Sequence, residues 1–74
     1  MKDTDLEILY GLAEGKTEGQ IARDLGLSMT VTAVSNRVRY MRRFYGARTS
    51  AQLIAEAYHR GILKAPKVYS GANE

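Results

Sequence analysis

The sequence predicts an all-α domain of four helices, and three observations lead to this prediction. Apolar residues recur at steps of three and four along most of the chain, which is the spacing that places side chains on one face of a helix. Threonines stand where helices are expected to begin and glycines stand where they are expected to end. No stretch has the alternating pattern of a strand.

The first helix is predicted to begin at Thr4, because Thr4-Asp5-Leu6-Glu7 has the pattern of a capping box. It should stop near Gly15. Gly11 lies inside this helix, where glycine lowers helix stability by about 1 kcal/mol relative to alanine. Either a neighbouring element approaches the backbone closely at this position, or the loss of stability is tolerated. The residues expected to face the core are Leu6, Ile8, Leu9, Leu12 and Ala13.

A second, short helix is predicted from Thr17, which would cap it together with Gln20. Ile21, Ala22 and Leu25 should face inward. Gly26 suits the left-handed position that ends a helix, and residues 27–28 complete a tight connection. A short helix, a small residue for close crossing, a glycine turn and a longer basic helix follow one another in the order of a helix-turn-helix.

The third helix, residues 30–45, is the stretch around which the rest is organised. Ser28, Thr30 or Thr32 can cap it, and Thr30 is favoured because Val31 then opens the apolar stripe. That stripe consists of Val31, Val34, Val38, Met41 and Tyr45. The opposite face carries Thr32, Asn36, Tyr40 and Arg43, with Ala33 and Arg39 at its edges. Such a helix suits a DNA groove, and the alternative is an ordinary surface helix with solvated arginines.

The last helix is predicted from a cap at Thr49 to about Arg60, with Gly61 as its stop. Its apolar residues cover an arc that is wider than packing on one side requires. We therefore expect a dimer contact through this helix, formed by Ile54, Ala57 and Tyr58. Residues 1–63 should form one domain, and residues 64–74, which have no period, a flexible C-terminal tail.

Composition limits the class of protein. The chain has 74 residues and no cysteine, so disulfides and thiolate metal sites are excluded. It has no apolar run of about 20 residues and no signal-peptide core, which indicates a soluble cytoplasmic protein. Residues 1–29 hold three basic against six acidic side chains, whereas residues 30–74 hold eight basic against two acidic ones. This asymmetry indicates a polyanionic partner.

Enzymatic chemistry is not expected from these residues. His59 is the only histidine and has no neighbouring ligand set, so no metal site is predicted. The sequence offers no set of residues for a nucleophile with its base, a phosphate-binding glycine loop or a pair of buried carboxylates. The sequence therefore predicts a binding protein without a cofactor.

Two runs of the chain resemble the LuxR/GerE-type helix-turn-helix. The first is the run from Leu9 to Ser28, with Leu-Ala-Glu-Gly at 12–15, Ile-Ala at 21–22 and Leu-Gly-Leu-Ser at 25–28. The second is the run from Tyr45 to Leu63, with Tyr-Gly-Ala-Arg at 45–48 and Arg-Gly-Ile-Leu at 60–63. The stretch between Ser28 and Gly46 is two residues longer than is usual in the family.

The resemblance implies a four-helix DNA-binding domain whose third helix enters the major groove and whose fourth helix commonly dimerises. The family's positions toward DNA then fall on Thr32, Ser35, Asn36, Arg39 and Arg43. The chain departs from the family at Arg37, where a histidine is common, and at Gly19, where a basic residue is often found.

Each candidate contact has an alternative. Asn36 could pair with adenine N6 and N7 or face solvent. Arg39 and Arg43 could reach guanine edges or phosphates. Arg37 is expected to contact the DNA backbone or to pair with acids of the first two helices. Tyr40 could pack against a sugar of the DNA or could simply be a half-buried aromatic residue. Thr17 and Thr30 could bind phosphates at the starts of their helices or could act only as helix caps.

The favoured function is a sequence-specific transcriptional regulator that binds duplex DNA, as a homodimer. The alternative is a protein-interaction adaptor that binds RNA polymerase or another regulator through the apolar arc of the last helix. RNA binding is a weaker third hypothesis, because the aromatic residues form no evident stacking platform.

Overall fold

The computed structural model of the chain describes residues 3–26 and 29–64 and confirms an all-α fold. Its four helices are α1 (Asp3–Ala13), α2 (Glu18–Asp24), α3 (Val31–Tyr45) and α4 (Ser50–His59). The described ranges contain no strand. The predicted connection at 27–28 and, apart from Lys64, the predicted tail lie outside the described residues.

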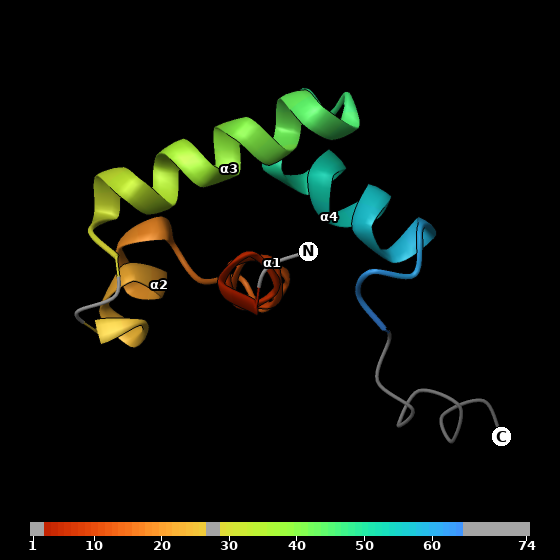
Figure 1. The fold of residues 1–74 in the computed structure, drawn as a ribbon. Helices are drawn as coiled ribbons and strands as arrows, with labels where there is room; N and C mark the ends of the chain where they lie inside the picture. The colour runs from red at the N-terminus through yellow and green to blue at the C-terminus, as the bar shows by residue number, and fades with distance from the viewer. Residues whose placement is uncertain (1–2, 27–28, 65–74) are drawn as a thin grey trace, which may run out of the picture.

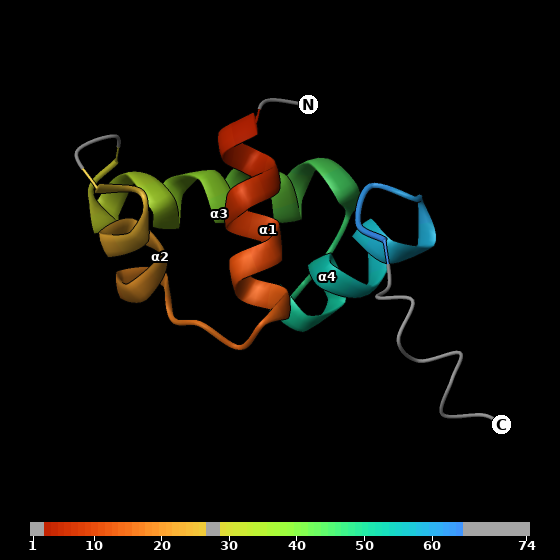
Figure 2. The same cartoon turned by 90° about the horizontal axis from the view of Figure 1, so that it is seen from below.

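The longest helix, α3, lies along one side of the molecule, and α1 crosses beneath it (Figures 1 and 2). The helices α2 and α4 lie on either side of α1, toward opposite ends of α3 (Figure 2). All four helices contribute to the core between them, which consists of Ile8, Leu9, Ile21, Ala22, Val34, Val38, Met41, Ala47, Leu53, Ala57 and Leu63. None of the described helices is both long and apolar enough to cross a membrane.

The predicted caps of the last three helices are confirmed. Thr17 forms a full capping box with Gln20, and Thr30 and Thr49 each accept a hydrogen bond from a backbone N–H three residues on. The prediction for Thr4 is wrong, because α1 already includes Asp3 and so places Thr4 inside its first turn. An earlier start puts Asp3 near the positive end of the helix dipole, which favours an acidic side chain.

Gly11 marks a close crossing between α1 and α2. A Cβ atom at this position would lie 2.7 Å from Cγ1 of Ile21, whose side chain is itself buried. A side chain at position 11 would therefore overlap α2. Of the two explanations for this glycine, close approach is the one that the structure supports.

Candidate nucleic-acid interface

The helix α3 is fixed at both ends by its own sequence. Thr30 Oγ1 accepts a hydrogen bond from the Ala33 N–H at 3.1 Å, which satisfies one of the unpaired donors of the first turn. Gly46 ends the helix in a left-handed conformation with φ of 72°. The start at Thr30 and the end at Gly46 are both as predicted.

The predicted inward stripe of α3 is confirmed for four of its five residues. Val34, Val38 and Met41 are buried, and Tyr45 is half-buried against the core. The prediction for Val31 is wrong, because this side chain is 50% exposed. Helical side chains tilt toward the N-terminus, so the side chain of the first helical residue extends beyond the turn that packs on the core.

The opposite side of α3 is open to solvent and is called here the outer face. None of the other described helices covers it (Figure 1). Its exposed residues are Thr32, Asn36, Arg39, Tyr40 and Arg43. This set is the predicted one. Ser35 lies at the border: it is half-buried, and its hydroxyl donates a hydrogen bond to Glu18 at the start of α2.

Two residues of the outer face are joined to each other. The Nη1–H of Arg39 donates to Oδ1 of Asn36 at 3.0 Å, across one turn of the helix. Both side chains remain exposed. The contact therefore orients the asparagine amide and the guanidinium relative to one another, without removing either from the surface.

Arg37 is directed toward α1 and away from the outer face. Its Nε and Nη2 donate to the two carboxylate oxygens of Asp5 at 3.0 and 2.5 Å. Asp5 is only 5% exposed, and its hydrogen bonds raise the pKa of Arg37 above the usual value. The predicted pairing with an acid of the first two helices is thus the arrangement observed, and the charge of Arg37 is matched within the domain.

The side chain of Arg42 is also used in a contact within the domain. Its Nη2 donates to the carbonyl oxygen of Arg48, in the connection between α3 and α4. Its Nε is buried, with no hydrogen-bond partner among the described residues. Arg39 and Arg43 are therefore the two arginines of α3 that are exposed and lie on the outer face.

The two threonine candidates act as helix caps. Thr17 Oγ1 accepts from the Gln20 N–H at 3.1 Å, and Thr30 accepts in the same way at the start of α3. Both side chains are exposed. Because Glu18 contacts Ser35, the beginning of α2 lies beside the first half of α3. Capping accounts for both threonines, and Thr30 lies directly before α3.

The predicted dimer contact requires a correction. Ala57 is 2% exposed and belongs to the core, so it is not available to a second chain. Ile54 is half-buried and packs against the core, whereas Tyr58 is exposed. The apolar arc of α4 is wide because this helix contacts both α1 and α3. Leu53, Ile54 and Ala57 are thus used within one chain, and Tyr58 remains exposed.

An exposed aromatic patch at the end of α3 was not predicted. Phe44 is 67% exposed, and Tyr40 is 53% exposed. Their rings stack with centroids 6.2 Å apart, and the rings of Phe44 and Tyr45 are nearly perpendicular with centroids 4.8 Å apart. The guanidinium of Arg37 lies 4.8 Å from the Tyr40 centroid. Phe44 lies off the apolar stripe and four residues after Tyr40, which is the signal in the sequence that could have revealed the patch.

The chain matches no protein-family model, no curated protein and no solved structure. Its function therefore has to be inferred from its own geometry and charge.

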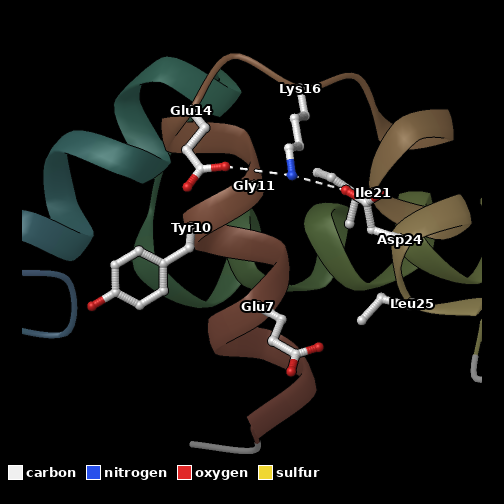
Figure 3. A pocket seen from close by; sticks show the side chains of 8 residues that line it. All are labelled: Glu7, Tyr10, Gly11, Glu14, Lys16, Ile21, Asp24 and Leu25. Atoms are coloured by element: carbon white, nitrogen blue, oxygen red, sulfur yellow. Dashed lines mark hydrogen bonds and ion pairs between the residues drawn. The ribbon is translucent and has the colours of Figure 1, made fainter.

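A hollow lies on another side of the molecule, between α1 and α2. It has a volume of about 330 Å³ and contains Lys16 between two carboxylates (Figure 3). The Lys16 Nζ lies 2.8 Å from Asp24 and 3.4 Å from Glu14. The hydrogen bond that Lys16 donates to Asp24 raises the pKa of Lys16, which keeps the amine protonated and unsuited to nucleophilic attack. No group of three metal-ligating side chains occurs within residues 3–26 and 29–64.

Proposed function

We propose that this protein binds duplex DNA in a sequence-dependent way and acts as a transcriptional regulator in the cytoplasm. The observation that carries the proposal is the division of α3 into two faces. One face packs in the core. The other is uncovered and presents two arginines, an asparagine and a threonine, which are donors of the kind that reach base edges and phosphates.

The dimensions of α3 suit this role. Fifteen residues span about 22 Å, and the major groove of B-DNA, about 12 Å wide, admits an α-helix. The start of α2 lies beside α3 through the contact between Ser35 and Glu18. In a helix-turn-helix the first helix crosses the DNA backbone while the second enters the groove. The resemblance to LuxR/GerE-type domains favours the same arrangement.

The distribution of charge supports a polyanionic ligand. Arg39 and Arg43 lie on the outer face itself, and Arg48, Arg60 and Lys64 are exposed elsewhere in the second half of the chain. Binding through such contacts releases counterions from DNA, so affinity should fall as salt is raised.

The first experiment is a fluorescence anisotropy titration of a random-sequence duplex pool at several salt concentrations, followed by selection and sequencing of the tightest binders. We expect affinity that decreases steeply with salt and a recurring motif. Two charge-reversal variants test whether the outer face is the DNA-binding site. R39E/R43E changes the outer face, and R23E/K64E changes net charge equally at exposed positions outside α3.

The double reversal on α3 should abolish binding, while the matched control should retain most of it. Equal losses in both variants would mean that only net charge matters, and would contradict recognition by α3. Undetectable binding of the wild-type protein at low salt would contradict the proposed function altogether.

Dimerisation remains part of the proposal, with Tyr58 as its central residue in place of Ala57. A dimer should select two half-sites related by symmetry. The Y58E variant should then bind only one half-site, with lower affinity than the wild type, and sedimentation velocity would report loss of the dimer. A selected motif without symmetry would contradict the dimer while leaving DNA binding intact.

The aromatic patch favours a second candidate function, as an adaptor for RNA polymerase or another regulator. Exposed aromatic residues that adjoin one another are typical of protein contact sites. In this second candidate function the docking surface consists of Tyr40 and Phe44, and not of the apolar arc of α4 expected from the sequence. F44S separates the two functions: it should leave DNA affinity within about twofold of wild type, whereas it should disrupt an adaptor, which R39E/R43E would leave active.

A further inference from the structure

The contact between Asn36 and Arg39 changes what the outer face can recognise. A single asparagine amide offers one acceptor and one donor side by side, which matches N6 and N7 of adenine. Here the acceptor, Oδ1 of Asn36, already faces the Nη1–H of Arg39 at 3.0 Å. The adenine pairing expected from the sequence alone therefore meets a competitor within the protein.

The pair presents hydrogen-bond donors to its surroundings. An arginine has five N–H donors and no acceptor, and one of those donors is used on Asn36. The amide NH₂ of Asn36 adds two more. A second lone pair on Oδ1 does not restore the match to adenine, because the adenine amino group would have to approach the same oxygen beside a guanidinium that also carries N–H donors.

Base edges in the major groove differ in how they meet such a surface. Guanine presents two acceptors, O6 and N7, and no donor. Adenine and cytosine each present an amino group, which conflicts with a donor, and thymine presents one acceptor, O4. A surface made of donors thus favours guanine, then thymine.

The remaining arginine of the outer face has no such partner. Arg43 is exposed, and no hydrogen bond or ion pair from its side chain is recorded among the described residues. It lies one turn beyond Arg39 and is suited to a phosphate, which positions the helix without reading sequence. The two arginines of the same face therefore differ in the type of contact that they can make.

We propose that Asn36 and Arg39 act as one unit that presents only donors and selects guanine at one position of the bound site. This inference rests on the proposed DNA binding and specifies its sequence preference. It assigns Arg39 a dual role, because the arginine both contacts the base and withdraws the acceptor of Asn36 from it.

The test compares selected motifs for the wild-type protein, R39A and N36A, using the random-sequence duplex pool described above. The position that both substitutions alter identifies the base in question. For the wild type we expect guanine there, with a loss of about tenfold or more when adenine replaces it. R39A should bind more weakly overall, and its preference at that position should move toward adenine, because Oδ1 of Asn36 is released.

R43A is the matched control, since it removes an arginine from the same face. It should weaken all sequences about equally and leave the motif unchanged. An adenine preference in the wild type would overturn the inference, and so would an unchanged motif for R39A, while DNA binding would stand. Failure of the wild type to bind any duplex at low salt would overturn the proposed function and this inference together.

Discussion

At the scale of single residues, the contact between Asp5 and Arg37 joins α1 to α3. Asp5 is buried and accepts two hydrogen bonds from one guanidinium. Removing the carboxylate leaves the half-buried guanidinium of Arg37 without its partner. We expect D5A to lower the free energy of unfolding by about 1.5–3 kcal/mol, the range for hydrogen bonds to charged groups.

Urea denaturation measures this change, and E7A provides the matched control. Glu7 is an exposed acid of the same helix with no side-chain hydrogen bond or ion pair among the described residues, so E7A should change stability by less than about 0.5 kcal/mol. Equal effects of the two substitutions would contradict a specific role for the contact. The pair could be foreseen only in part: the position of Arg37 beside the apolar stripe predicted an acidic partner, but five acids besides Asp5 precede Gly26.

At the scale of helices, the sequence was most informative about where α2, α3 and α4 begin and end. Caps at Thr17, Thr30 and Thr49 depend on contacts between residues three apart, so local sequence determines them. The burial of Ala57 and the exposure of Phe44 depend instead on which helices meet. Spacing along one helix defines a face, but it does not tell how many neighbours that face will contact.

Gly11 offers a prediction about the packing of α1 on α2. In an isolated helix, alanine is more stable than glycine by about 1 kcal/mol, so helix propensity alone favours G11A. The overlap with Ile21 acts in the opposite direction, because the buried isoleucine has little room to move. Overpacking costs about 1–3 kcal/mol, and we expect net destabilisation in thermal or urea unfolding.

Gly19 supplies the control for that substitution. It also lies in a helix, and a Cβ atom there would be no closer than 3.8 Å to Oγ1 of Thr17. G19A should therefore stabilise the protein by about 0.5–1 kcal/mol. Opposite signs for G11A and G19A would identify steric overlap as the cause. Stabilisation by both would show that α1 and α2 are less tightly packed than the structure indicates.

At the scale of the whole molecule, charge is distributed unevenly in space as well as in sequence. Glu14 and Asp24 lie beside Lys16 at the hollow, Asp5 pairs with Arg37, and Glu18 accepts a hydrogen bond from Ser35. The exposed arginines on the outer face have no acidic partner among the described residues. A polyanion should therefore be attracted most strongly to the outer face, which orients the protein before specific contacts form.

The salt dependence of binding tests this arrangement one charge at a time. Each phosphate neutralised contributes about −0.9 to the slope of log K against log salt concentration. R43Q should reduce the magnitude of the slope by about one, since Arg43 is assigned to a phosphate. R23Q removes an exposed charge of the same kind from α2 and should change the slope less. Equal slopes for the wild type and R43Q would mean that Arg43 does not contact the DNA backbone, and the outer face would then be oriented by another set of charges.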